Sequence, residues 1–289
     1  MRDGFININK AKDMTSHDVV NIVRKIMQTK KVGHAGTLDP FATGVLPVAV
    51  GRATKFVDYL ADCDKSYRAE ILFGIETDTG DITGKIINRA DFTMPLTKTI
   101  ETNLNLFIGT IEQVPPKYSA IKINGRKAYE LARKNIEFTL PSRSVTINNI
   151  SIVNVTDNTL TIDVDCSKGT YIRSLAVDIA AKMNTSATLN NLQRSRVGDF
   201  FVSEAVTLNK LQEVGDNSIV EVDACLKHLP KFNLPAHRVR AFCNGLSTRV
   251  NKNLADELIF RVYADDEFVG LGKVIDGEIK SVKLYKKEM

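Results

Sequence analysis

The sequence predicts a two-domain α+β protein, and three observations support this prediction. Its 289 residues are about twice the length of a typical domain of roughly 150 residues. Runs that alternate apolar and polar residues, as antiparallel strands do, lie between runs with helical spacing. The pattern breaks around Pro230 and Pro235, and short strands with turns follow over about sixty residues. We therefore expect a large α+β domain over residues 1–229 and a small β-rich domain over residues 230–289.

The composition excludes low-complexity and membrane-spanning proteins. Hydrophobic residues make up 43% and charged residues 25% of the chain, which is ordinary globular usage. No apolar run reaches the roughly 18 residues of a membrane span, and the first residues lack the apolar core of a signal peptide. We therefore expect a soluble, cytoplasmic protein.

The cysteines and histidines are scattered along the chain. The four cysteines form no C-x-x-C pair and the four histidines have no close ligand spacing, so a structural zinc site is not expected. Lone cysteines are typically small buried hydrophobic residues in a reducing compartment. We predict this for all four, which are Cys63, Cys166, Cys225 and Cys243.

The first elements in chain order are a helix and a rigid loop. Thr15 and Ser16 precede apolar residues at helical spacing, which predicts a helix over residues 17–28 with a capping residue in front of it. Residues 33–55 hold four glycines and two prolines among few charges. This composition predicts a structured loop and a short buried strand.

Further strands and helices are predicted in the middle of the chain. Residues 67–74 predict a strand that enters an acidic turn, and residues 96–107 predict a helix. Residues 145–155 and 160–166 alternate apolar and polar side chains, as two paired antiparallel strands do. A helix with an apolar stripe follows, and Arg173 lies beside that stripe in the first turn, where its head group reaches the strand end.

A basic segment lies between Lys117 and Arg143, with seven basic and two acidic residues. Its paired prolines enforce extended chain and Asn124-Gly125 marks a turn, so we predict a protruding loop with an element of its own. The last ten residues form a second basic patch. Solvated surface charge is the commoner cause of such runs, but two patches on a near-neutral chain are also compatible with a polyanionic partner.

The sharpest local signal is the single carboxylate in the rigid loop. Glycines and prolines fix an unusual backbone around Asp39, and His34 lies five residues earlier. An Asp-Pro pair is most often only a turn or a helix cap. A catalytic carboxylate in a rigid setting is the alternative, and the loop by itself leaves both interpretations open.

Five motifs follow one another along the chain. The first is GHAGTLDPFATGVLPVAVGRATK, and the others are KSYRAEILFGIETDTGDITG, VPPKYSAIKINGRKAYELAR, CSKGTYIRSLAVDIA and LNNLQRSRVGDF. In this order they resemble the motifs of the bacterial tRNA pseudouridine synthase B family, and the first is similar to the family signature. Together they cover most of residues 1–201, and five matches in order are far more specific than one.

The resemblance implies a reaction and a site. The family isomerises uridine in RNA by breaking the bond from base N1 to the ribose and rejoining the ribose to C5. Asp39 matches the catalytic aspartate, and Arg173 matches the arginine that pairs with it and keeps it ionised. Tyr67 matches the tyrosine that stacks on the target base. Leu192 matches an apolar residue beside the base, and His34 matches the histidine that fills the space left by the extruded uridine.

Two positions depart from the family pattern. Where the family commonly has K-P-x-G-x-T-S, this chain has Ala11 for the proline and Asp13 for the glycine, while Lys10 is kept as a candidate substrate contact. The change should alter local backbone stiffness. The acidic turn at Glu76, Asp78 and Asp81 suggests a divalent cation by composition, but its two glycines and its place in the second motif favour a structured turn.

The resemblance also implies the fold and the partner. We expect the pseudouridine-synthase fold, a long mixed and largely antiparallel sheet with packed helices, followed by a PUA-like domain. The expected substrate is uridine 55 in the T-loop of tRNA, with no cofactor and no metal. We expect a basic thumb-like insertion to bind RNA through Lys122, Arg126 and Lys127.

Two other functions are weighed against this one. A non-catalytic RNA-binding or tRNA-folding protein would use the same surfaces, but it would not need Asp39 together with Tyr67 and Arg173. A guide-RNA-dependent synthase would bring additional segments and partner proteins. We expect instead a monomer with no obligatory protein partner.

Overall fold

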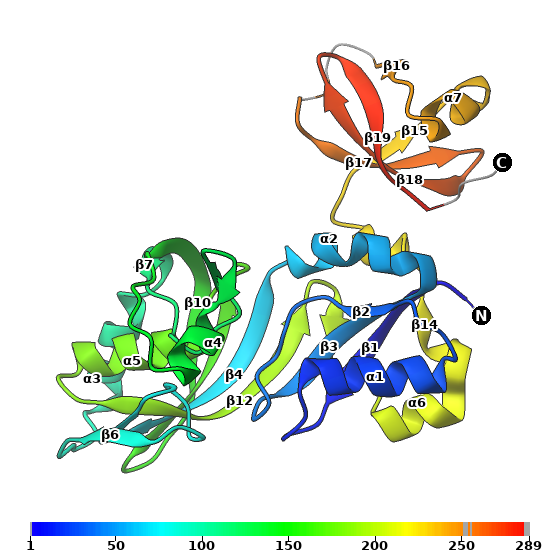
Figure 1. Cartoon of the computed structure of the whole chain (residues 1–289). Helices are drawn as coiled ribbons and strands as arrows, with labels where there is room; N and C mark the ends of the chain where they lie inside the picture. The colour runs from blue at the N-terminus through cyan, green and yellow to red at the C-terminus, as the bar shows by residue number, and fades with distance from the viewer. Residues whose placement is uncertain (1, 251–253, 255, 286–289) are drawn as a thin grey trace.

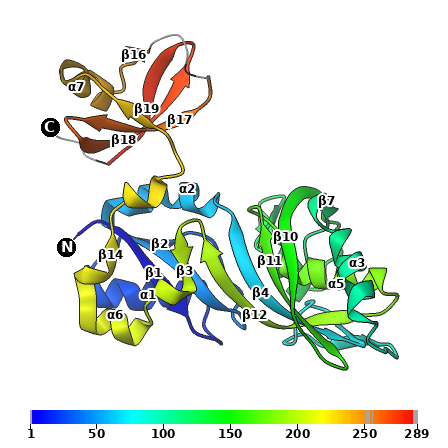
Figure 2. The ribbon, with the colours of Figure 1, turned by 180° about the vertical axis from the view of Figure 1, so that it is seen from behind.

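The structure is a computed structural model, and it describes residues 2–250, 254 and 256–285. Figure 1 shows a broad sheet with helices packed on it and a smaller C-terminal part beyond α2, and Figure 2 shows the same arrangement from behind. Lys286 and Lys287 of the C-terminal basic patch lie outside the described residues.

The predicted long sheet is confirmed. Within the described residues it has ten strands, and all of its pairings are antiparallel except the one between β12 and β3. Its strands in spatial order are β14 (Ile219–Val220), β1 (Gly4–Lys10), β3 (Thr43–Val50), β12 (Ala187–Val197), β4 (Lys65–Phe73), β11 (Thr159–Cys166), β10 (Arg143–Val155) and β7 (Gly109–Gln113). Two short strands lie off this path, with β2 (Val32–His34) on β3 and β13 (Phe200–Phe201) on β12.

Helices cover both halves of this sheet, as Figure 1 shows. The first predicted helix is α1 (Ser16–Ile26), where Thr15 and Asp18 form a reciprocal capping box. The helix after the strand pair is α5 (Ile172–Lys182), and its predicted apolar stripe is buried against β4, β11 and β12 together with α3 (Thr97–Asn105). The remaining helices of this region are α2 (Val57–Ala61) and α6 (Leu208–Val214), with 3₁₀ turns η1 (Gly51–Phe56), η2 (Val202–Glu204), η3 (Gly215–Ser218) and η4 (Ala224–Leu226).

The basic insertion has elements of its own, as predicted. Strands β8 (Lys122–Ile123) and β9 (Arg126–Lys127) form a separate hairpin, which α4 (Ala128–Arg133) follows directly. Asn124 and Gly125 both have positive φ, 48° and 84°, as a tight two-residue hairpin turn requires. The acidic turn is also structured, because it joins β5 (Ile75–Thr77) to β6 (Ile86–Arg89) in another hairpin.

The C-terminal part is rich in strands, as predicted, but it also holds short helical elements that the sequence pattern did not indicate. The helix α7 (Val239–Cys243) and the 3₁₀ turn η5 (Ala236–Arg238) precede most of its strands. Its described strands form one sheet in the order β15 (Lys231–Asn233), β17 (Ile259–Ala264), β18 (Glu267–Ile275), β19 (Glu278–Leu284) and β16 (Thr248–Arg249). This sheet is anchored to η1, where Phe56 packs against Phe268 and Lys55 donates to the Leu284 carbonyl at 3.1 Å.

The cysteine prediction is half right. Cys166 and Cys225 are buried, but Cys63 and Cys243 are only partly buried because they lie near the ends of short helices at the surface. Among the described residues, no three His, Cys, Asp or Glu side chains gather closely enough to hold a metal ion. No helix in the described ranges is long and apolar enough to cross a membrane.

Candidate active site

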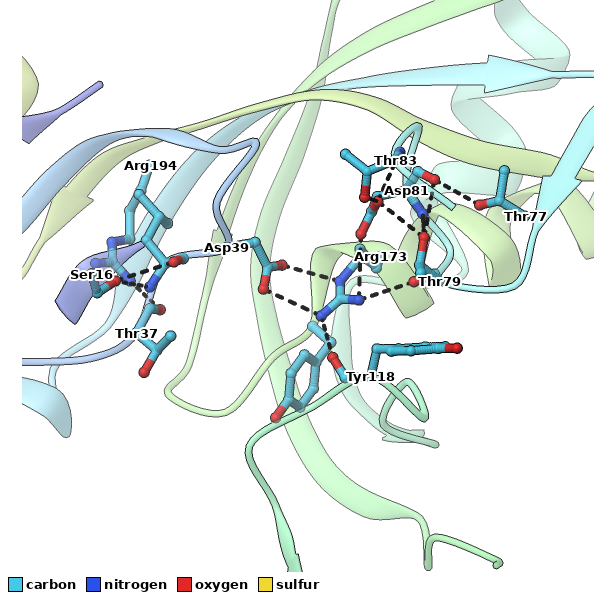
Figure 3. A network of polar contacts seen from close by, with 12 residues as sticks. Ser16, Thr37, Asp39, Thr77, Thr79, Asp81, Thr83, Tyr118, Arg173 and Arg194 are labelled. Carbon is cyan, nitrogen blue, oxygen red and sulfur yellow. Dashed lines mark hydrogen bonds and ion pairs between the residues drawn. The ribbon is translucent and has the colours of Figure 1, made fainter. Parts of the chain in front are cut away.

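Asp39 and Arg173 meet although 134 residues separate them in the chain. Asp39 lies on the loop between β2 and β3, and Arg173 lies in the first turn of α5. Nε of Arg173 is 3.1 Å from Oδ2 of Asp39, and Nη2 donates to Oδ1 at 3.4 Å (Figure 3). The guanidinium side chain is 5% exposed and the carboxylate side chain 33% exposed. A substrate can therefore reach the carboxylate while its counterion stays buried.

Other contacts fix the direction of the Arg173 head group. Nη1 donates to the Thr79 carbonyl at 3.0 Å, and Nη2 donates to the Tyr118 carbonyl at 2.9 Å. Nη1 also lies 3.4 Å from Oδ2 of Asp81, which is buried in the acidic turn. Arg173 thus joins the Asp39 loop, the acidic turn and the start of the basic insertion, as Figure 3 shows.

The charges around Asp39 act in opposite directions. Burial raises the pKa of Asp39 above its usual range, and the nearby Asp81 carboxylate adds to this effect. The Arg173 guanidinium acts most strongly in the other direction, and Lys10 and Arg194 add smaller effects of the same sign. The site therefore holds a carboxylate whose ionised form depends on its arginine partner.

Three buried side chains hold the backbone of the Asp39 loop. Ser16 Oγ accepts from the Leu38 N–H at 2.9 Å and donates to the Leu38 carbonyl at 3.1 Å. Arg194 donates to the carbonyls of Gly36 and Thr37. Lys10 is the third, and its ammonium group donates to the carbonyl of Pro40. The loop is therefore fixed on both sides of Asp39.

The predicted substrate contact through Lys10 does not fit this geometry. Its side chain is fully buried, and Nζ donates to the carbonyls of Ala11, Met14 and Pro40 at 2.9, 2.7 and 3.1 Å. Burial lowers the pKa of Lys10 to about 8. The ammonium group therefore stabilises the loop from inside, where it joins the start of α1 to the residue after Asp39.

Asp13, which stands where the family commonly has glycine, adopts a backbone conformation that glycine favours. Asp13 has φ of 64°, in the left-handed region where glycine is the easiest residue and aspartate is better tolerated than most. Its N–H donates to the Pro40 carbonyl at 2.8 Å. Asp13 thus adopts a glycine-like conformation and adds one more contact to the Asp39 loop.

Tyr67 and Leu192 lie in the same buried cluster, which also includes Leu38 next to Asp39. Tyr67 is 8% exposed and Leu192 is 5% exposed, and they belong to the paired strands β4 and β12. Burial raises the pKa of Tyr67. A neutral phenol and an apolar side chain thus line the sheet near the Asp39 loop.

His34 lies at the end of β2, opposite Val48 on β3. Its Nδ1 is buried without a hydrogen-bond partner among the described residues. Burial is the main effect that lowers the pKa of His34, and the positive charge of Arg194 adds to it. The neutral ring is therefore favoured, which suits a contact with a nucleic-acid base.

The three basic residues of the insertion lie apart from this cluster. Lys122, Arg126 and Lys127 are all exposed on the β8–β9 hairpin. Lys122 and Lys127 are directly opposite each other in its register. The structure therefore brings Asp39, Arg173, Tyr67, Leu192 and His34 into one region and puts the basic residues on a separate surface hairpin.

Three residues of the site were missed from the sequence. Ser16 was noted only as part of a helix start, and Asp81 only as part of an acidic turn. Arg194 follows Leu192 by two residues on β12, so it occupies an inward position that alternation reserves for apolar side chains. A charged residue at an inward strand position was the available signal.

Two family models match this chain. Residues 24–172 match the family model described as TruB family pseudouridylate synthase (N terminal domain). Residues 230–284 match the model described as Pseudouridine synthase II TruB, C-terminal. The fold is that of a pseudouridylate synthase.

Curated relatives cover nearly the whole chain. A protein from Clostridium kluyveri named tRNA pseudouridine synthase B is 43% identical over 98% of this chain and 99% of its own length. A protein of the same name from Bacillus pumilus is 44% identical over 81% of this chain and 79% of its own. A chain in the crystal structure of a Cbf5-Nop10-Gar1 complex aligns with a TM-score of 0.77 and 25% identity, over 98% of this chain and 85% of that one. The chain belongs to the TruB family of pseudouridylate synthases.

Proposed function

We propose that this protein converts uridine 55 in the T-loop of tRNA to pseudouridine. The general activity, isomerisation of uridine in tRNA without regard to position, follows from the family of this protein and from the names of its relatives. The single observation that carries the proposal is the Asp39 carboxylate, one-third exposed and held by a buried guanidinium. A protein that only bound RNA would have no use for this pair.

The reaction needs bond rearrangement without a change in redox state. The bond between N1 of the base and C1′ of the ribose breaks, the base turns, and C5 bonds to C1′. N1 then gains a proton and C5 loses one, so the product is an isomer of the substrate. We propose that the Asp39 carboxylate assists the first step, the breaking of the N1–C1′ bond, and that Arg173 orients this carboxylate.

The other predicted side chains have roles that fit their positions. Tyr67 stacks on the extruded base and takes part in removing the C5 proton, and Leu192 packs beside the base. His34 fills the space that the extruded uridine leaves, which suits a neutral aromatic ring. Lys10 acts inside the protein and has no contact with RNA in this proposal.

The basic hairpin supports a polyanionic partner. Lys122 and Lys127 are directly opposite each other, an arrangement that repels like charges and destabilises an isolated hairpin. Phosphate groups between them would remove this repulsion. We propose that Lys122, Arg126 and Lys127 bind the tRNA backbone, and that residues 230–289 form a second RNA-binding domain beside the catalytic domain of residues 1–229.

We further propose a cytoplasmic monomer without an obligatory protein partner. The monomer is supported by the Asp39–Arg173 pair, which forms within one chain and needs no residue from a second copy. Light scattering of the purified protein with and without tRNA tests this point. One protein per tRNA is the expected composition, and a dimer in both samples would contradict it.

The activity is tested with purified protein and a T-arm transcript. Pseudouridine is mapped by carbodiimide treatment and primer extension, and a transcript with cytidine at position 55 is the control. A single stop at position 55 is expected. Binding without any modification would instead favour a tRNA-folding protein.

The role of the hairpin is tested by replacing its three cations together with alanine. Affinity falls as salt rises, and each lost phosphate contact should make the slope of log affinity against log salt less steep by about 0.7 to 0.9. A control variant loses three exposed lysines elsewhere, Lys98, Lys182 and Lys227. Equal slopes in the two variants would contradict the proposed contact.

A further inference from the structure

Arg194 lies where three strands of the large sheet meet. On β12 it is directly opposite Tyr67 of β4 and opposite Gly44 of β3. Gly44 has φ of 101°, and a Cβ there would lie 2.3 Å from the Arg194 carbonyl oxygen. Only glycine therefore allows β3 to approach β12 closely at this point.

The Arg194 side chain binds three backbone carbonyls and is 1% exposed. Nε donates to Val45 at 2.8 Å, Nη1 to Thr37 at 3.3 Å and Nη2 to Gly36 at 3.1 Å. The acceptors lie on both sides of Asp39, at the start of its loop and on the strand that follows it. The planar fork of the guanidinium thus fixes the two ends of the loop relative to β12.

These acceptors are neutral, and no carboxylate among the described residues lies within ion-pair distance of the guanidinium. Burying a cation without a counterion costs several kcal/mol, and a neutral amide could bind carbonyls at a lower cost. Holding the loop carbonyls therefore does not by itself explain why the side chain at position 194 is positively charged. The Asp39 carboxylate and the Tyr67 phenol of the proposed site lie within reach of this charge.

The charge of Arg194 favours the ionised forms of both groups. It opposes the effect of burial on the pKa of Asp39, where Arg173 and Lys10 act in the same direction and Asp81 acts against them. It also opposes the effect of burial on the pKa of Tyr67, which it faces across the β12–β4 pairing. One buried guanidinium therefore acts on the two side chains that the reaction would use.

We propose that Arg194 is a positioning residue that locks the Asp39 loop to the Tyr67 strand and holds a positive charge between them. It supports the two catalytic groups from inside the sheet and does not touch the substrate. The inference rests on the proposed function, since it assigns a second arginine to the same site.

Three variants test this inference. Arg194→Met removes the charge and the fork, and Arg194→Lys keeps the charge but loses the fork. Arg196→Met is the matched control, because Arg196 is two residues further along β12 and bonds to Asp165 and Ser66 away from the Asp39 loop. The measurements are the single-turnover rate, tRNA affinity, the acid limb of the rate profile and hydrogen exchange of residues 33–44.

The expected results separate positioning from general stability. Arg194→Met should lower the rate about 100-fold with affinity within about threefold, and should move the acid limb to higher pH. Arg194→Lys should lower the rate at least about tenfold, leave the acid limb unchanged and speed exchange in residues 33–44. Arg196→Met should stay within about threefold of the parent in rate and leave that exchange unchanged.

Opposite results would overturn the inference. If Arg194→Met kept the parental rate and the parental acid limb, Arg194 would have no role in the site. Equal rate losses in Arg194→Met and Arg196→Met would contradict the proposed role as well. If Arg194→Met does not unfold cooperatively, Arg194→Lys decides, and parental exchange and rate in that variant would contradict the proposal. Because hydrogen exchange needs no turnover, it still tests the loop lock if the parent protein makes no pseudouridine.

Discussion

Replacing Ser16 with alanine should weaken both the fold and the reaction. Ser16 is 3% exposed, and its hydroxyl is bonded to both the N–H and the carbonyl of Leu38, which is 4% exposed. Alanine removes both bonds and leaves two buried polar groups without them. Each such group costs about 1–3 kcal/mol, so the free energy of unfolding should fall by about 2–6 kcal/mol.

The consequence reaches Asp39 because Leu38 is the residue before it. A loss of about 2–6 kcal/mol corresponds to a fall in melting temperature on the order of 10 °C for a protein of this size. Freedom at Leu38 shifts the Asp39 carboxylate from its place on Arg173, and a displacement of about 1 Å typically costs about 100-fold in rate. We expect a rate loss of about 10- to 100-fold with little change in tRNA affinity.

The assay combines urea unfolding followed by circular dichroism with single-turnover kinetics on a T-arm transcript. Ser218→Ala is the matched control, because its hydroxyl makes one bond to the Gly215 carbonyl, far from Asp39 in the chain. That variant should lose about 1 kcal/mol or less and keep its rate. If Ser16→Ala were as stable and as fast as the parent, the Leu38 bonds would not hold the loop and the reasoning would be refuted.

Three further predictions concern the neighbours of Asp39. Arg173→Lys keeps the charge but loses the fork that meets both carboxylate oxygens, so single-turnover kinetics should show a large fall in rate while filter binding shows little change in affinity. The acid limb of the rate profile should lie above the ordinary aspartate pKa of 3.8, because activity is lost as pH falls through the raised pKa of Asp39. The Asp81 carboxylate contributes to that raised pKa, so Asp81→Asn should move the acid limb to lower pH. Asp13→Gly should keep the parental stability in urea unfolding, whereas Asp13→Val should lose about 1–2 kcal/mol because valine disfavours the left-handed conformation.

The sequence predicted the elements whose signal is local. Alternation marked β10 and β11 as an antiparallel pair, and helical spacing marked the buried stripe of α5. The pairing of Asp39 with Arg173 came from the motif resemblance, since no local pattern joins residues 134 positions apart. The Asn124-Gly125 turn was identified because its residue types fit one backbone conformation.

The parts that were missed depend on register and on three-dimensional packing. Arg194 meets Tyr67 only because β12 pairs with β4 in one register, which neither strand specifies by itself. Lys10 was predicted to contact the substrate, but three carbonyls from two segments, the turn before α1 and the Asp39 loop, surround its ammonium group. The short α7 was missed because five residues are too few for helical periodicity to emerge.

The central claim is that the Asp39 carboxylate rearranges the glycosidic bond, and Asp39→Asn tests it most directly. Asparagine has nearly the same shape but no negative charge, so it removes the chemistry and preserves the loop. Pseudouridine at position 55 of a T-arm transcript is measured under single-turnover conditions, together with tRNA affinity. The account predicts no detectable product and near-parental affinity, because phosphate contacts supply most of the binding. Substantial product from Asp39→Asn or from Asp39→Ala would contradict the claim.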